Sequence, residues 1–260
     1  IKISFSSLNI NTKSFQWTTD VMFYANKESI ESLYNGKVDD IGNKWFIGHP
    51  INVHYDYEKI GIWQNTSEDL AEMEEFNKNG ANFKPGDIKI WDNGDKKITE
   101  ADRKILGSTS PKFIASMVNS ISYKGFDFSI FLYASVGAML NNNIEYLNKP
   151  GRANSIVIDY WTPTNPTNAY PRPSVDNASP AYVKSLQYEK ADFIRVRNIT
   201  LGYTLPEKLL KKIRARKIRV YLSANNPFVI TGFSGIDPEG ARGYTAPSAS
   251  TWMGGVNLSF

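Results

Sequence analysis

Hydrophobic and polar residues alternate with a period of two along most of this chain, which predicts extended strands with two different faces. In the segment 126–136, one face carries only apolar residues, which are Phe126, Phe128, Ile130, Leu132, Ala134 and Val136. Similar alternation covers 15–24, 198–205, 218–225 and 251–260. We predict strands of about 10–13 residues, whereas strands of globular proteins usually have about 5–6.

The connections between these predicted strands alternate in length. Three are short, at 9–13, 124–125 and 206–215, and three are long, at 27–110, 137–190 and 231–250. Short turns on one side and long loops on the other are typical of outer-membrane barrels, whose strands need about 9–11 residues to cross a bilayer. A soluble antiparallel sandwich also has alternating faces, so the pattern alone leaves both folds open.

Helical periodicity is rare. The two candidates are the segments 67–77 and 206–213, and Ser67 is expected to cap the first of them, whose first turn is acidic.

Composition removes several classes of protein. The 260 residues are 41% hydrophobic, 13% aromatic and 22% charged, which excludes a disordered or collagen-like chain. The absence of cysteine excludes disulfides, thiolate zinc sites and cysteine nucleophiles, and two histidines are too few for a histidine-rich metal centre. A formal net charge of +4 gives little reason to expect a polyanionic partner.

No group of residues predicts an enzyme. We find no nucleophile with a base, no general-base pair and no glycine loop of the kind that holds phosphate. The basic run at 208–219 lacks the interleaved aromatic residues that stack on bases and lies on a short link, so we predict a solvated turn and no nucleic-acid partner.

Several short blocks occur together along almost the whole chain. They are YEKIGIWQ at 57–64, PGDIK at 85–89, NGD at 93–95, DR at 102–103, YKGFD at 123–127, FIRVRNITLGY at 193–203 and VNLSF at 256–260. Through these blocks the chain resembles the C-terminal part of the SusC/RagA family of TonB-dependent outer-membrane transporters of Bacteroidetes.

This resemblance implies an all-β fold, namely the C-terminal segment of a large antiparallel transmembrane β-barrel of the roughly 22-stranded type. Residues 1–260 would be part of a longer polypeptide, without its N-terminal extension, plug and earlier strands. The segments 27–110, 137–190 and 231–250 would be long extracellular loops, and the short links would be periplasmic turns.

The implied function is uptake of oligosaccharides or peptides across the cell outer membrane. The implied partners are a SusD-like surface lipoprotein, outer-membrane lipid, and the TonB-ExbB-ExbD complex acting through the missing N-terminal part. The alternative is a soluble secreted β-sandwich that binds carbohydrate. In the barrel, Val220 and Leu222 should face lipid while Tyr221 and Ser223 face the lumen.

An acidic stretch resembles a degraded calcium loop, in which carboxylates at alternate positions surround the ion. Its candidate ligands are Asp92, Asn93, Asp95 and Asp102. One residue is missing between the first two, and Lys96 occupies the position that is usually glycine. An ordinary turn with Asx hydrogen bonds is therefore the favoured interpretation and calcium the alternative, and no other cofactor is expected.

Aromatic residues in the long proline-rich loop could contact a substrate or a partner. The candidates are Tyr160, Trp161 and Tyr170. The alternative is that these rings only pack the loop against itself.

The chain terminus carries an alternating set that ends on an aromatic residue, and this set is Trp252, Val256, Leu258 and Phe260. The resemblance implies that these residues form the signal through which the barrel assembly machinery recognises the last strand. The alternative is that Phe260 simply packs at the end of a sheet.

Overall fold

The computed structural model describes residues 1–142, 157–173, 180–210, 215–239 and 248–260. Seven long strands form one antiparallel sheet with the order β1-β2-β7-β8-β11-β12-β13. Its strands are β1 (Lys2–Asn11), β2 (Phe15–Tyr24), β7 (Phe113–Tyr123), β8 (Phe126–Val136), β11 (Phe193–Thr204), β12 (Lys217–Thr231) and β13 (Thr251–Ser259). The predicted antiparallel all-β fold is confirmed, and within the described residues the sheet is open.

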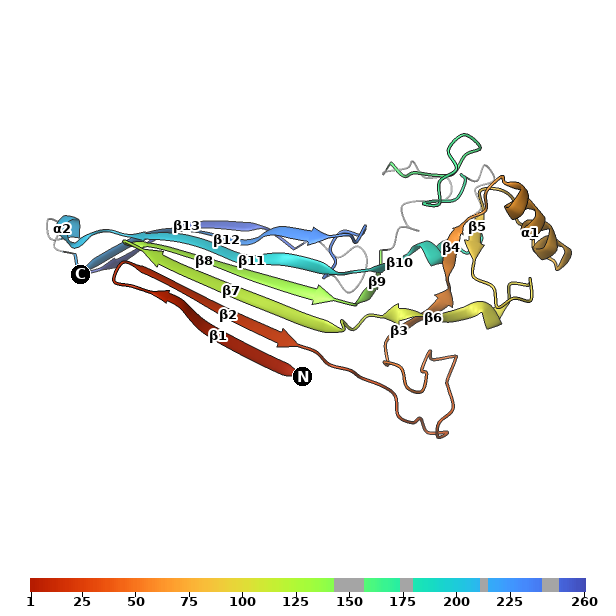
Figure 1. Cartoon of the computed structure of the whole chain (residues 1–260), viewed down its shortest axis with the longest axis horizontal. Helices are drawn as coiled ribbons and strands as arrows, with labels where there is room; N and C mark the ends of the chain where they lie inside the picture. Colours follow the sequence, from red (N-terminus) through yellow and green to blue (C-terminus); the bar gives the residue numbers. More distant parts are fainter. Residues whose placement is uncertain (143–156, 174–179, 211–214, 240–247) are drawn as a thin grey trace.

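Each long strand pairs with the long strand that precedes or follows it along the chain, so the sheet is a simple up-and-down meander. Figure 1 shows it as one long, gently curved layer with the short links at one end and the long connections at the other. The long strands contain between 9 and 15 residues, which is enough for a tilted strand to cross a bilayer.

The tightest link joins β7 to β8 through Lys124 and Gly125. Both residues have positive φ, at 47° and 91°, as the two-residue turns that match the twist of a hairpin require. A Cβ atom on Gly125 would lie 2.9 Å from the carbonyl oxygen of Thr204, so the glycine also allows β11 to approach the turn closely.

A bulge interrupts β11 at Arg197, between Val196 and Asn198, in its pairing with both neighbours. On the β12 side, Asn226 and Pro227 lie opposite this position, and Asn226 has a φ of 49°. The irregularity explains how a proline is tolerated inside a long paired strand, because a bulge residue donates no ladder hydrogen bond.

Beyond the long-connection end of the sheet, the chain forms a group of small elements that we call the loop cluster. It contains the strand pairs β3 (Val53–Tyr57) with β6 (Arg103–Ser108), β4 (Lys59–Ile62) with β5 (Ile88–Ile90) and β9 (Met139–Asn141) with β10 (Tyr188–Lys190). It also contains α1 (Ser67–Lys78) and the 3-10 helices η1 (Glu100–Asp102) and η3 (Val183–Leu186). In Figure 1, α1, β4 and β5 lie at the end of the molecule farthest from the short links.

The helix predicted at 67–77 is present as α1, but its N-cap is Thr66 and not Ser67. The Thr66 hydroxyl accepts a hydrogen bond from the amide of Asp69 at 3.3 Å. Helix α2 (Glu207–Leu210) lies in the link between β11 and β12. None of the helices in the described ranges is both long and apolar enough to span a membrane.

Most of the buried hydrophobic side chains lie in the loop cluster, and the strands of the large sheet contribute only Phe193 and Ala224 among the described residues. One group of buried side chains contains Trp63, Met73, Phe76 and Phe83. A second contains Ile62, Ile88, Ile90 and Trp161. These side chains join α1, β4, β5 and the segment 157–173, so the long connections carry a folded unit of their own.

Candidate functional site

The large sheet has one apolar face that no other element covers within the described chain. Leu201 on β11 lies directly opposite Leu222 on β12, and these side chains are 52% and 56% exposed. The other exposed apolar residues of this face include Ile3, Phe5, Phe126, Val220, Trp252, Val256 and Leu258. A soluble sandwich would bury such a face against a second sheet, whereas a membrane barrel presents it to lipid.

The opposite face of the same strands carries hydrogen-bonded polar side chains. Asn198 on β11 donates to Ser223 at 3.0 Å and to Asn225 at 2.8 Å, both on β12. The Thr200 hydroxyl donates to the Asn198 amide oxygen at 3.0 Å and lies 2.8 Å from the Ser223 hydroxyl. Ser223 is only 6% exposed, so this network holds the two strands in register on the face away from lipid.

Nearer the short links, the polar face carries an ion pair between Asp127 on β8 and Arg219 on β12. The guanidinium donates to both carboxylate oxygens, at 2.9 and 2.5 Å. The pair passes over Gly202 on the strand between them, where a Cβ atom would lie about 2.5–2.6 Å from both side chains. The sequence analysis missed this pair, although a glycine inside a strand can mark such a close approach.

Near the other end of β11, Arg195 binds the segment 232–239 through Asp237. Its guanidinium donates to Asp237 at 2.6 Å, and both side chains are below 10% exposed. Burial alone would raise the pKa of Asp237, but hydrogen bonds from the amides of Glu239 and Ser248, together with Arg195, lower it below its usual value. A buried pair of this kind is strongly destabilising to break, so this segment is firmly attached to the sheet.

The three candidate loop aromatics are neighbours in the backbone, because Tyr160 forms a bridge with Tyr170 and the Trp161 amide donates to the Tyr170 carbonyl oxygen at 3.0 Å, but their side chains lie in different surroundings. Trp161 is 6% exposed, packs in the loop-cluster core, and donates its indole N–H to Gln64 at 2.8 Å. Tyr160 is 42% exposed, and Tyr170 lines a hollow of about 380 Å³ beside Lys59. Packing of the loop therefore accounts for Trp161, which presents no free ring for a ligand.

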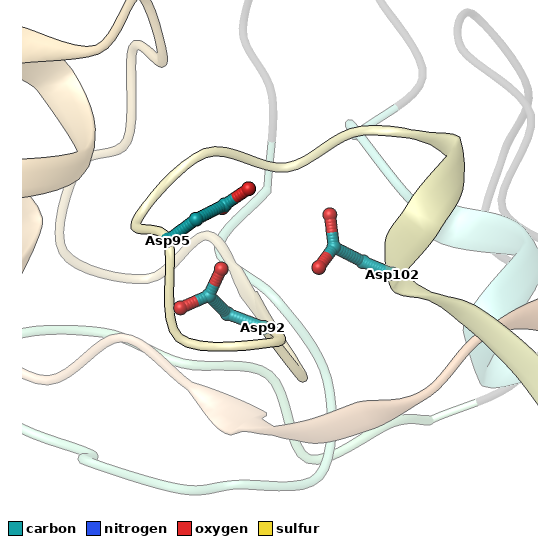
Figure 2. Close-up of side chains that lie close together, drawn as sticks. All are labelled: Asp92, Asp95 and Asp102. Carbon is teal, nitrogen blue, oxygen red and sulfur yellow. The ribbon is translucent and has the colours of Figure 1, made fainter.

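The acidic stretch brings three carboxylates together, as Figure 2 shows. One oxygen from each of Asp92, Asp95 and Asp102 lies within 4.8 Å of the others. Asp102 has no exposed surface, and its two oxygens accept hydrogen bonds from the amides of Asn93 at 3.0 Å and Thr99 at 2.6 Å. Carboxylate oxygens at this spacing fit the ligand chemistry of calcium.

Backbone hydrogen bonds already use most of these oxygens. Asp92 accepts from the amides of Gly94 and Lys96, and Asp95 accepts from the amide of Lys97. Lys96 has a φ of 58°, and its ammonium group lies 2.8 Å from Glu72 on α1. These contacts are those of the ordinary Asx turn that the sequence favoured. One buried oxygen of Asp92 has no hydrogen-bond partner and is the group that a cation would need.

The variant Asp92→Asn discriminates between the turn and a calcium site. Its side-chain oxygen still accepts both backbone hydrogen bonds, and the change removes one of three clustered charges. For a turn, we expect amide exchange across 92–102 to stay within about twofold of the wild type, with or without 1 mM calcium. Calcium-dependent protection in the wild type that Asp92→Asn abolishes would instead establish a metal site.

His54 makes the stability of the loop cluster depend on pH. Its Nε2 atom lies 3.0 Å from the carbonyl oxygen of Met139, which joins β3 to β9. Burial lowers the pKa of His54 below its usual value, the nearby Lys44 ammonium lowers it further, and the Met139 carbonyl acts in the opposite direction. The folded state therefore binds fewer protons than the unfolded state just below about pH 6.5.

We expect the protection of the β3 amides, corrected for intrinsic exchange, to be full above about pH 6.5 and to fall as the pH drops through the lowered pKa of His54. The variant His54→Gln should make that protection independent of pH between 5 and 7.5. His49→Gln, which changes the only other histidine, should keep the wild-type pH dependence. Equal behaviour of the two variants would contradict the assignment.

The residues of the predicted assembly signal share the exposed apolar face of β13 and the residue that follows it. Trp252, Val256, Leu258 and Phe260 are 63%, 56%, 57% and 76% exposed. Phe260 is the most exposed of the four, and its role in assembly stays a prediction.

Comparisons with known proteins identify the relatives of this chain. TonB-dependent receptor P3 of Formosa agariphila is 31% identical over an alignment of 255 residues, gaps included, that covers 92% of this chain and 24% of the receptor. TonB-dependent receptor SusC of Bacteroides thetaiotaomicron is 28% identical over 276 residues, which cover 100% of this chain and 26% of SusC. The homologues of this chain are TonB-dependent receptors. The resemblance drawn from the sequence blocks is thereby confirmed, although no family model matches the chain.

Solved structures agree on the fold of this TonB-dependent receptor homologue. A chain of the RagAB peptide importer in the open-open state superposes on all of it with a TM-score of 0.75 and 24% identity, over 28% of that chain. A structure of the RagAB peptide transporter gives the same TM-score at 23% identity, over 29% of that chain. The described sheet thus has the fold of part of an outer-membrane β-barrel, and the outer-membrane location is confirmed.

The chain spans about a quarter of the length of the curated relatives it matches. TonB-dependent receptors are transport proteins and not enzymes, in agreement with the sequence analysis.

Proposed function

We propose that this chain forms part of the wall and outer loops of an outer-membrane importer that takes up oligosaccharides or peptides through TonB. The main support is the homology to TonB-dependent receptors along the whole chain, together with a meander that exposes one apolar face. The apolar face would contact lipid, and the polar face with its Asp127–Arg219 ion pair would line the lumen.

The long connections would form the extracellular rim in this proposal. They fold into the loop cluster with its own core, and Arg195 and Asp237 attach another of them to the barrel wall. A rigid rim of this kind is suited to hold a partner, which we propose to be a SusD-like surface lipoprotein. TonB, ExbB and ExbD would supply energy through parts of the protein outside this chain.

Uptake by a strain that lacks the gene tests this function. The strain should lose growth on at least one member of a panel of oligosaccharides and peptides given as sole nutrients. The wild-type gene should restore that growth, and a protonophore should abolish the restored uptake because TonB-linked transport uses the proton gradient. Wild-type growth of the deletion strain on the whole panel would contradict the proposal.

Partnership requires a separate measurement. Full-length protein with an affinity tag, extracted in mild detergent, should bring down a surface lipoprotein in about equal amounts. Recovery of the receptor alone after crosslinking of intact cells would count against a lipoprotein partner while leaving the uptake function standing.

A further inference from the structure

A hollow of about 760 Å³ opens in the loop cluster between β3, β6 and the turn before η3. Three tyrosines line it, namely Tyr55, Tyr57 and Tyr182. Its volume is in the range of small-molecule sites, and such sites combine aromatic walls with a few polar groups. None of the three candidate contact aromatics lines it, and the acidic stretch at 92–102 contributes only Glu100.

The tyrosine walls are held in place by their surroundings. Tyr55 and Tyr57 are two residues apart on β3 and therefore share one face of that strand. The ring of Tyr55 packs against the buried Phe46 at 4.7 Å, and the ring of Tyr57 meets Tyr182 edge-on at 5.1 Å. Arg103 on β6 pairs with Tyr57 across the strands and lies 5.2 Å from its ring centroid.

Cations outnumber acids in the lining of this hollow. Its lining contains Lys44, Arg103 and Lys184 as cations. Of its two acids, Glu100 pairs with Arg103 at 3.2 Å. The other, Asp56, has both oxygens occupied, because one accepts from the Tyr188 hydroxyl and one from a backbone amide.

Among the described residues, neither Lys44 nor Lys184 has an acidic partner. Lys44 and Lys184 form no ion pair with any part of the chain that the structure describes. The ammonium of Lys44 is close enough to His54 to lower the pKa of that residue, so it lies beside β3. Two exposed ammonium groups that form no ion pair with the described residues thus flank the tyrosine walls.

From this arrangement we infer that the hollow binds an oligosaccharide that carries carboxylate groups, such as a uronic-acid oligomer. Sugar rings present C–H groups that pack against tyrosine rings, and sugar hydroxyls hydrogen-bond to tyrosine hydroxyls. The carboxylates would pair with Lys44 and Lys184. An acidic peptide is less well matched, because extended peptides are usually held by an open strand edge and the hollow is walled by side chains. This inference rests on the proposed uptake function and names its substrate class.

Calorimetric titration of the full-length detergent-solubilised protein with trigalacturonate tests the inference. The double variant Lys44→Asn/Lys184→Gln removes both ammonium groups, and asparagine tolerates the positive φ of 59° at position 44. We expect it to bind trigalacturonate about tenfold more weakly than the wild type, since each exposed ion pair contributes about 0.2–1 kcal/mol. The control Lys27→Gln/Lys37→Gln removes two exposed lysines from the connection that also carries Lys44, and it should keep wild-type affinity.

Two further ligands complete the experiment. Neutral galactotriose should bind more weakly than trigalacturonate and show no difference between the two double variants. A triglutamate peptide should bind weakly to all of the proteins. If the wild type bound triglutamate as tightly as trigalacturonate and the double variant of Lys44 and Lys184 did not, the ligand of the hollow would be an acidic peptide and not a sugar.

Failure of this inference can be distinguished from failure of the uptake function. Equal trigalacturonate affinity in the two double variants would overturn the inference alone, provided that the deletion strain still loses growth on some nutrient. A deletion strain with no growth defect would overturn the uptake function itself.

Discussion

Deletion of Phe260 from the full-length protein is expected to remove most of it from the outer membrane while leaving its synthesis unchanged. We propose that the assembly machinery recognises the last strand through its exposed apolar row, and Phe260 ends this row at 76% exposure. The ring makes no supporting contact with the rest of the described sheet, so its loss should cost the folded barrel little stability. The large effect would therefore arise during assembly.

Heat-modifiable gel mobility of outer-membrane fractions measures this outcome, because a folded barrel migrates differently before and after boiling. The matched control is Tyr123→Ala, which removes an aromatic ring of 46% exposure from the same apolar face near the short links. The control should assemble at close to wild-type levels. Normal abundance of the folded Phe260 deletion would count decisively against an assembly role.

The second large effect is expected at Leu222. Its side chain is 56% exposed near the middle of the apolar row of β12, between Leu201 and Gly254 on the neighbouring strands. The variant Leu222→Arg would place a charge in hydrocarbon and should lower the free energy of unfolding by about 2–4 kcal/mol. Denaturant unfolding of the full-length barrel in lipid vesicles measures this quantity.

Met253→Arg is the matched control for the lipid face. Met253 pairs with Ser223 on the polar face and is 44% exposed, so an arginine there can reach the aqueous lumen. We expect this control to change the free energy of unfolding by less than about 1 kcal/mol. Equal destabilisation by the two variants would mean that the faces have been assigned the wrong way round.

The long strands were predictable where one face is apolar without interruption, as along β8. In β11 the bulge at Arg197 reverses the alternation, so the sequence indicated a strand only from residue 198 and missed its first part. Strands of three or four residues such as β4 and β5 are too short for a period to be recognised, so the loop cluster was not visible in the sequence.

Candidate sites were predictable only where the partners are close in sequence. Asp92 and Asp102 were grouped by their spacing, and the structure does bring their oxygens together. Arg195 and Asp237 are 42 residues apart and meet only because the sheet brings the end of β11 to the long connection after β12. The role of Trp161 stayed open because an aromatic residue in a proline-rich loop has the same local sequence whether it packs inside or meets a ligand.

The bulge at Arg197 divides β11 into two halves with opposite phase. On its C-terminal side, odd-numbered residues such as Leu201 face lipid, whereas on its N-terminal side Arg195 faces the polar interior. Deleting Arg197 itself would therefore remove the bulge and leave both halves on their present faces, because Val196 and Asn198 already lie opposite the consecutive residues Leu132 and Phe131. Deleting one residue elsewhere in β11, with the bulge kept, would turn one half over and could direct the Arg195 guanidinium, now paired with Asp237, toward lipid. A change of one residue in the length of this strand is therefore tolerable only at the bulge.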